Sequence, residues 1–593
     1  MKLRFVIYIC TVCMLMQLQS CKNDLNLTPV DQFAAENVWN NASTIRVYIN
    51  NIYTGVPHGY GNIMLSTVSD EYVWFADATI SRITRSEITP SDLLYFDLRV
   101  GNYGNGYRLK TMNMERVYTF IRYANLFFSN IDNSAVDVPT KNIFKGVVFF
   151  LRAFMYHNLV ATYGGVPIIT KVYGLNDDYA APRNTYAECI KFISDQCDSA
   201  AFYLPLKQVG GDNIVRATKG AAMALKSRTL LYAASDLYNN EAAWAGGVNK
   251  ELVGYVGGNR TERWTAAKNA AKAVIDLGVY SLYKPTPAST DEAIKNYSDI
   301  FLLNETTEDI FIRRFTSNLY DGYEYAPGRW NLPAGYRGNG AAQVIGQLVD
   351  DYEFTDGTAF SWSNPIHAAN PYVKRDPRLY SSIFYEGASW RARPPQYMPK
   401  DPIGKIQLGV WQTSKTGVTK GIDNGLTGYY MRKFMDPTVE DPQNTTQAIP
   451  WRFIRYAEVI LNYAEACIEL GEETEALTWL NKIRTRSKMP LITTTGSALR
   501  QSCRHERRIE LAFEDHRYFD IRRWMIADQV YVNPEIIKPV YLWNGTSTDV
   551  SPTYGVSFET GTFRRSWLPK SYFLPFALDE MNRNNKLVQN PLY

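Results

Sequence analysis

Titratable side chains gather between residues 505 and 524, in the stretch HERRIELAFEDHRYFDIRRW. General acid–base catalysis and metal binding use the residue types found here: His505, Glu506, Glu510, Glu514, His516 and Asp520. A zinc-peptidase helix has the pattern HExxH, but the residue four positions after His505 is Ile509. On a helix, Glu506 and Glu510 share a face with neighbouring arginines, which favours ion pairs. We therefore interpret the stretch as a structural charge network.

A glycoside hydrolase would need two carboxylates about 5 to 10 Å apart, on either side of the scissile bond. Asp70–Glu71 and Asp350–Asp351 are the pairs to consider. Adjacent residues point to different sides of the chain, so neither pair makes this geometry unaided. The sequence also contains no phosphate-binding loop and no dinucleotide fingerprint. We therefore expect no catalytic activity.

Aromatic residues make up 14% of the chain, with 41 Tyr and 13 Trp. Some of these rings must form the core, but a chain so rich in Tyr and Trp also has flat faces available for stacking. The formal charge of +4 is small for 593 residues, and no basic run stands out. Nucleic acid is therefore not an expected partner.

The N-terminus has the features of a bacterial lipoprotein signal. Lys2 and Arg4 precede an apolar run over 5–16, which is too short to span a bilayer. Leu-Gln-Ser-Cys at 18–21 resembles a lipobox, so Cys21 is predicted to be the lipidated first residue of the mature chain. Residues 1–20 would then be the signal peptide and 21–35 a tether. The alternative is an ordinary signal peptide with a chance cysteine.

The remaining cysteines after Cys21 are Cys189, Cys197, Cys467 and Cys503. Four in some 570 residues do not form a disulfide framework. Cys189 and Cys197 lie two helical turns apart and are expected to be small buried side chains. Because no Cys and His cluster has zinc spacing, no cofactor is predicted, although structural calcium stays open. Removing the signal peptide lowers the formal charge from +4 to +2.

Helical periodicity dominates the sequence. Helices are expected at 145–165, from the Thr185–Glu188 capping box to Pro205, at 217–238, from Trp264 to Gly278, and as a pair within 451–487. In that pair one helix runs to about Leu470, Gly471 makes the turn, and the second helix carries Ala476, Trp479, Leu480 and Ile483. Small and large residues alternate there as in a tetratricopeptide hairpin. The sequence thus predicts a mostly α fold built on degenerate helical repeats.

Long segments between these helices are rich in Gly, Pro, Asn and Tyr: 284–300, 316–350 and 355–450. Loops of this length are functional or disordered, and their aromatic content argues against disorder. We therefore expect an ordered, loop-rich face mounted on a helical back.

Several motifs in order resemble the SusD/RagB family of outer-membrane lipoproteins of the Bacteroidetes. They are SCKNDLNLTPVDQF, FLRAFMYHNLVATYGGVPIIT, APRNTYAECIKFISDQCDSAAFYLP, VRATKGAAMALKSRTLLYAAS, LVDDYEFTDG, RDPRL, IRYAEVILNYAEA, HERRIELAFEDHRYFDIRRW and LPFALDEMNRNNKLVQNPLY. The resemblance implies about four tetratricopeptide-like helix pairs in a single domain over 36–593, with parts at about 36–280 and 281–593. It also implies that the protein captures oligosaccharides at the cell surface for a SusC-like TonB-dependent transporter, and that only its lipid anchor contacts the membrane.

Glycan binding needs aromatic faces for sugar rings and polar groups for hydroxyls. By resemblance, the stretch 69–82 turns toward the ligand, with Trp74 as a stacking residue beside Tyr72; packing in the core is the alternative. The stretch 313–340 shows no helical or strand period, so its aromatics are expected to be exposed or semi-exposed. Its candidates are Tyr320, Tyr323, Trp330 and Tyr336, with Arg329 and Asn331 as hydroxyl partners and Trp330 as the anchor.

Three alternatives stay open. Some relatives of the RagB type serve peptide import, so a peptide is the second candidate cargo. A tetratricopeptide-type adaptor for peptide helices and a glycoside hydrolase are the others. The near-neutral charge disfavours a strongly anionic polymer, although a local arginine cluster could still bind one. Stacking aromatics indicate a sugar ring but not its identity or linkage.

Overall fold

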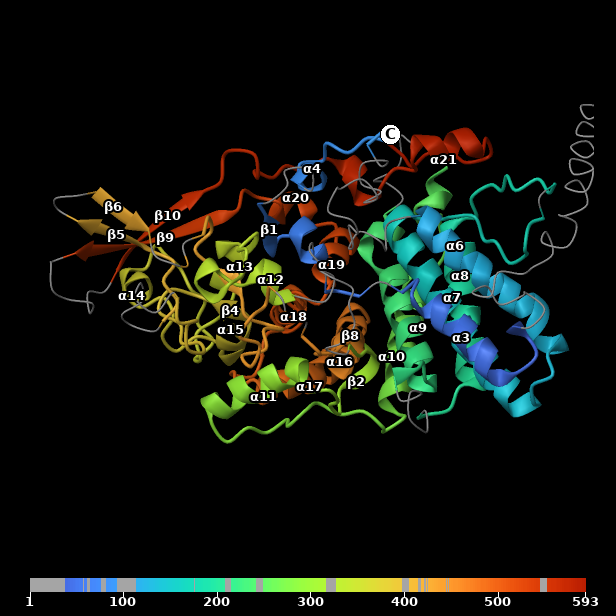
Figure 1. The fold of residues 1–593 in the computed structure, drawn as a ribbon, viewed down its shortest axis with the longest axis horizontal. Coiled ribbons are helices and arrows are strands. Elements are labelled where there is room, and N and C mark those ends of the chain that lie inside the picture. The colour runs from blue at the N-terminus through green and yellow to red at the C-terminus, as the bar shows by residue number, and fades with distance from the viewer. Residues whose placement is uncertain are drawn as a thin grey trace, which may run out of the picture.

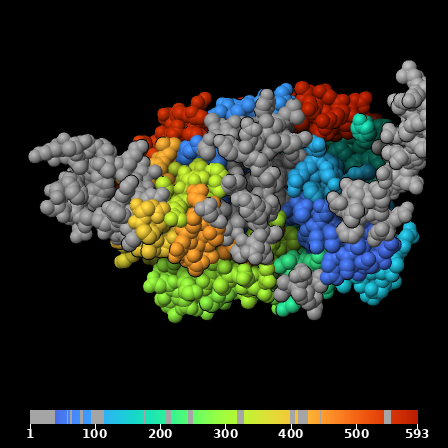
Figure 2. All heavy atoms as spheres, viewed as in Figure 1, coloured from blue at the N-terminus to red at the C-terminus, as the bar shows by residue number. Residues whose placement is uncertain are grey.

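The computed structural model describes residues 38–56, 58–60, 64–75, 81–92, 114–174, 176–207, 215–240, 249–315, 327–396, 405–413, 417–420, 423, 425–443, 445, 447–543 and 552–593. The predicted signal peptide, Cys21 and the tether lie outside these residues, as do Tyr320 and Tyr323. The N-terminal helices occupy one end of an elongated molecule, and the segments coloured green to orange occupy the other (Figure 2).

Helices of the N-terminal half form a layer in which consecutive helices pack side by side (Figure 1). They are α3 (Ala42–Tyr53), α6 (Met114–Asn130), α7 (Val138–Tyr163), α8 (Tyr186–Tyr203), α9 (Lys219–Ala234) and α10 (Arg260–Ile275). The predicted capping box is present: Thr185 accepts from the Glu188 amide while Glu188 accepts from the Thr185 amide. These helices confirm the predicted ones, with shifts of a few residues at most ends.

Helix α7 is the one described helix that is long and apolar enough to cross a membrane by length and composition. Most of it is buried between α6, α8 and α9, however, so it is a core helix. It begins at Val138, seven residues before the predicted start, because Asp137 caps it and Pro139 suits its first turn.

Helices of the C-terminal half continue the stack through α16, which packs on α10 and on its hairpin partner α17. The longer ones are α11 (Thr290–Leu302), α16 (Tyr456–Glu469), α17 (Glu473–Arg486), α18 (Gly496–Glu510) and α19 (Arg517–Arg523). Gly471 makes the α16–α17 turn at φ +78°, as predicted. Two predictions were wrong. Helix α11 begins inside the segment 284–300 expected to be irregular, and 451–455 is a strand rather than the start of a helix.

The strands form small sheets between the helices. β1 (Tyr72–Trp74) pairs with β3 (Ala342–Val344), β2 (Asp309–Arg313) with β8 (Trp451–Arg455), and β4 (Ile383–Phe384) with β7 (Tyr430–Met431), all antiparallel. A four-stranded sheet in the order β10-β9-β5-β6 projects from one end (Figure 1); its strands are β5 (Val410–Thr413), β6 (Gly417–Lys420), β9 (Glu535–Trp543) and β10 (Thr553–Phe558). Residues 451–455 directly precede a helix, but they form a strand because they pair with β2.

Short helices occupy the loop-rich segments. They are α4 (Ser81–Thr84), α12 (Pro327–Asn331), α13 (Gly346–Asp350), α14 (Pro365–Ala369), α15 (Pro377–Ser382), α20 (Ala527–Val530) and α21 (Leu578–Arg583). The 3₁₀ turns are η3 (Leu65–Val68), η5 (Ile131–Asn133), η7 (Asp236–Asn239), η9 (Lys250–Leu252), η10 (Ala334–Tyr336) and η12 (Pro569–Tyr572).

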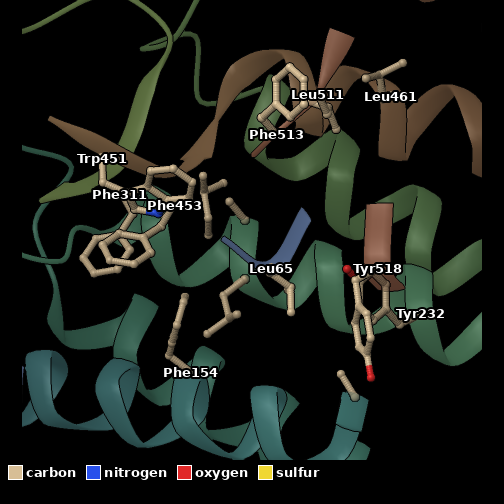
Figure 3. Packing of buried hydrophobic residues seen from close by; sticks show 14 of the residues in the cluster. Leu65, Phe154, Tyr232, Phe311, Trp451, Phe453, Leu461, Leu511, Phe513 and Tyr518 are labelled. Carbon is tan, nitrogen blue, oxygen red and sulfur yellow. The ribbon is translucent and has the colours of Figure 1, made fainter. Parts of the chain in front are cut away.

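One contiguous hydrophobic core joins both halves of the chain. In it the rings of Phe311 and Phe453 are stacked, with centroids 4.9 Å apart, and Phe154 of α7 packs against both (Figure 3). Cys189, Cys197, Cys467 and Cys503 are free and buried in the fold, which confirms that they do not bridge.

A buried ion network runs through the C-terminal half and confirms the structural interpretation of residues 505–524. Arg455 pairs with Glu308, Glu510 and Glu514, and Arg378 pairs with Glu506 and Glu510. Burial alone would raise the pKa of Glu510, but Arg486, Arg455 and Arg378 hold it well below its usual range. Glu506, Glu510 and Glu514 therefore find these partners on other elements, whereas Asp520 also pairs with Arg523 on its own helix.

Candidate functional site

The two aromatic stretches singled out in the sequence meet in the structure. Trp74 of β1 and Trp330 of α12 have ring centroids 5.6 Å apart, tilted by 53°. Backbone hydrogen bonds hold this arrangement. The Ala341 amide donates to the Trp330 carbonyl at 3.0 Å, and the Phe75 amide donates to the Ala341 carbonyl at 2.7 Å. Trp74 is 6% exposed, whereas Trp330 is half-buried. Trp330 thus offers part of its surface, and Trp74 supports it from behind.

Tyr72 and Asn331 form a buried contact beneath this pair. The Tyr72 hydroxyl donates to Asn331 Oδ1 at 2.5 Å, and Asn331 Nδ2 donates to the Pro327 carbonyl at 2.7 Å. Both side chains are at most 1% exposed. The expectation that they face the surface was therefore wrong, because their hydrogen bonds fix α12 against β1.

Tyr336 is also fully buried, although its segment lacks a period. The Arg393 guanidinium lies 4.4 Å from its ring centroid, and Arg393 in turn pairs with Asp423. This cation–π contact and the burial place Tyr336 in the core rather than on the expected exposed face. An aperiodic segment can be buried when its side chains pack against distant parts of the chain.

Arg329 lies beside Trp330 at the half-exposed surface. Its guanidinium is 5.5 Å from the Trp330 ring centroid, and Nη1 donates to the Gln443 carbonyl at 3.2 Å. The backbone N–H of the exposed Asn339 donates to the Arg329 carbonyl at 2.7 Å. The guanidinium next to the indole ring is thus held by Gln443, and its backbone by Asn339.

Further polar side chains around Trp330 were missed in the sequence. Gln443 Nε2 donates to Asn339 Oδ1 and to the Arg337 carbonyl, each at 2.7 Å, and Arg337 pairs with Asp441 at 2.9 Å. Residues 441–443 are about 110 positions after Trp330, and no local motif marks them. Only the fold brings them to this surface.

The carboxylates of the two pairs considered for hydrolysis contact other protein groups. Asp70 is 2% exposed and pairs with Arg508 and Arg517. Burial, and then the neighbouring Asp70, raises the pKa of Glu71 to about 7. Burial, and then the neighbouring Glu535 carboxyl, raises the pKa of Asp350 to about 8.

Among the described residues, no three His, Cys, Asp or Glu side chains are placed to hold a metal ion together. His157, expected to be structural, is buried with its Nδ1 2.9 Å from the Thr229 hydroxyl. Burial, followed by the charge of Arg228, lowers its pKa to about 3, so it stays neutral. The surface around Trp330 therefore offers stacking and hydrogen bonding, the chemistry of ligand binding.

Comparison with known proteins gives a consistent result along the chain. Residues 304–593 match the model of the SusD family, and residues 60–231 match a family described as starch-binding associating with outer membrane. A SusD-like protein of Formosa agariphila is 22% identical over 528 residues, covering 86% of this chain and 90% of that protein.

Solved structures show the same fold. A SusD-like protein from Bacteroides fragilis is 26% identical with a TM-score of 0.74, covering 96% of this chain and all of that one. A SusD-like carbohydrate-binding protein from the same species is 23% identical with a TM-score of 0.68, covering 93% of this chain and all of that one. These neighbours confirm the predicted mostly helical, tetratricopeptide-like fold class.

Proposed function

The chain belongs to the SusD/RagB family, and from that premise we propose that it captures oligosaccharides at the cell surface and delivers them to a SusC-like TonB-dependent transporter. The observation that carries the proposal is the Trp74–Trp330 pair: the partly exposed Trp330 ring lies beside Arg329, which is hydrogen-bonded to Asn339 and Gln443. This is the combination that a pyranose ring and its hydroxyls require.

An open surface suits a polymer better than an enclosed pocket does. Its binding energy comes from a few flat contacts, so Trp330 is the proposed anchor and Trp74 its support. Tyr320 and Tyr323 lie outside the described residues, and their contact with ligand stays a prediction. Tyr72, Asn331 and Tyr336 are assigned a supporting role, because their side chains are buried.

Attachment and delivery complete the proposal. Lipid chains on Cys21 would hold the protein on the outer membrane, which is the location that the second family description names. A permanent complex with a transporter needs a large interface, on the order of 2,000 Å² or more in total. With a formal charge near +2 after processing, such an interface would rely on apolar and hydrogen-bonded contact. Isolation from native membranes in mild detergent should recover a TonB-dependent barrel, and a free-standing protein would contradict this part.

A ligand screen tests the central proposal. The lipid-free protein, beginning after Cys21, is applied to an array of oligosaccharides and, in parallel, to an array of peptides. Binding of at least one glycan, lost in Trp330→Ala, supports the proposal. Binding confined to peptides would replace it with the peptide-import alternative of the RagB type.

A further inference from the structure

Two hollows adjoin along strand β2 and form one groove. Their volumes are about 350 and 570 Å³. They share five lining residues, which makes them continuous: Val215, Arg216, Phe311, Ile312 and Arg314. We call this the β2 groove. It shares no lining residue with the surface around Trp330.

Aromatic rings line the β2 groove. Phe311 lines both hollows and Phe453 lines one of them, and these two rings are the stacked, largely buried pair of the core. Tyr53 at the end of α3, and Tyr280 and Tyr283 after α10, are half-buried at its sides. The groove therefore offers apolar ring surface beside hydroxyl groups.

Positive charge exceeds negative charge around the β2 groove. Its lining includes four cationic side chains: Lys207, Arg216, Arg313 and Arg314. Two acids also line it, Glu305 and Asp309. Asp309 is already neutralised from outside the groove, because Arg452 Nε lies 2.6 Å from its carboxylate.

Two arginines lie where the hollows join. Arg216 is held in place, since Nη2 donates to Asn50 Oδ1 at 2.5 Å and its guanidinium lies 5.6 Å from the Tyr53 ring centroid. Arg314 pairs with Glu305 at 3.2 Å, and the Glu305 side chain is 66% exposed. A surface pair of this kind contributes little, so an incoming anion can replace Glu305.

We infer that the β2 groove is a second saccharide site, selective for a sugar residue that carries a carboxylate or sulfate group. The aromatic lining suits the ring, and guanidinium groups bind carboxylate and sulfate oxygens with charge-assisted hydrogen bonds. A neutral sugar would offer these cations only hydroxyl oxygens, which bind guanidinium groups more weakly than a carboxylate or sulfate does. The inference takes from the proposed function only that the ligands are saccharides.

Calorimetric titration at low salt tests the inference with four probes: tetragalacturonate, its methyl ester, a sulfated galactan tetrasaccharide and polyglutamate. We expect one or both acidic saccharides to bind at least tenfold more tightly than the methyl ester, and binding to weaken as salt rises. The two acidic probes distinguish carboxylate from sulfate recognition. Equal binding of acid and methyl ester, binding of neither acidic saccharide, or equally tight binding of polyglutamate would overturn it.

Variants assign the binding to the groove. Arg314→Gln removes the surface pair with Glu305 and one hydrogen bond to the Asn304 carbonyl. It should weaken acidic binding about tenfold, and Arg216→Gln/Arg314→Gln should weaken it further. Lys191→Gln is the matched control, because Lys191 forms an exposed pair with Asp195 on α8. Thermal melting checks that the double variant is folded, and Arg314→Gln alone decides the matter if it is not. Unchanged affinity in Arg314→Gln would contradict the inference.

The Trp330 surface provides the comparison that separates this inference from the proposed function. Trp330→Ala should leave acidic binding in the β2 groove unchanged while losing the ligand of its own surface. If the groove variants bind all saccharides normally and Trp330→Ala does not, the proposed function stands and the second site is refuted. If Trp330→Ala retains every ligand while the groove variants lose theirs, the proposed anchor is wrong and the groove remains.

Discussion

Asp70 accepts two hydrogen bonds from the Arg517 guanidinium, each at 2.7 Å. Asp70 lies two residues before β1, which carries Trp74, and Arg517 begins α19. The ion pair thus fastens the support of the proposed glycan surface to the buried charge network of the C-terminal half. The stretch 69–82, predicted to face the ligand, and the stretch 505–524, predicted to be structural, are therefore joined by a buried ion pair.

Replacing Asp70 by asparagine should strongly destabilise the protein. The change leaves the buried Arg517 without its carboxylate partner and Arg508 with only Asp351, and breaking a buried pair costs about 3 to 5 kcal/mol. Denaturant unfolding of the lipid-free protein measures this. Asp178→Asn is the control, because its pair with Lys586 is exposed and should contribute little. A loss below about 1 kcal/mol in Asp70→Asn would contradict the role assigned to the pair.

Replacing Trp330 by alanine should weaken glycan binding by about thirtyfold, since truncating an anchor costs about 2 kcal/mol. Trp330 and Trp479 are both half-buried, but the Trp330 indole N–H has no hydrogen-bond partner among the described residues, so the melting temperature should change little in Trp330→Ala. Trp479→Ala should do the reverse: its indole donates to Glu475 at 2.9 Å and packs on Tyr463 within the α16–α17 hairpin. Calorimetric titration and thermal scans of both variants measure the two effects. Normal binding with a much lower melting temperature in Trp330→Ala would make it a core residue.

Acid should destabilise the fold through Glu465. Burial alone would raise its pKa, but Arg523 lowers it from 4.5 to about 2. A carboxyl with a lowered folded pKa stabilises above its unfolded pKa, and this contribution is lost as pH falls from about 4.5 to about 2. The free energy of unfolding, followed against pH, should fall in this window. Glu465→Gln should be less stable at pH 7 and should show a shallower fall; an unchanged slope would refute the assignment.

Replacing Cys21 by alanine should release the protein from the membrane or leave it unprocessed. Each lipid methylene that enters the bilayer contributes about 0.8 kcal/mol, so two or more acyl chains anchor firmly. Membrane fractionation and fatty-acid labelling measure the effect. Full retention of labelled Cys21→Ala protein at the membrane would refute lipidation at this residue.

Local patterns in the sequence determined most of the helical scaffold. The capping box at Thr185, the stop at Gly471 and the 3.6-residue periodicity act over a few neighbouring residues, so they can be read without the fold. The structural character of 505–524 was also predictable, because so many acids and arginines in one short stretch must pair. Family motifs, which the comparisons confirm, gave the fold class.

Only the tertiary structure decided which residues reach the surface. Tyr336, Tyr72 and Asn331 are buried by partners far away in the chain, whereas Trp330, in the same short segment, stays half-exposed. Glu506 and Glu510 pair with Arg378 rather than with neighbours on their own helix, and 451–455 is a strand because β2 lies beside it. Burial, ion pairing and strand pairing depend on contacts between distant segments, and a local pattern does not contain those contacts.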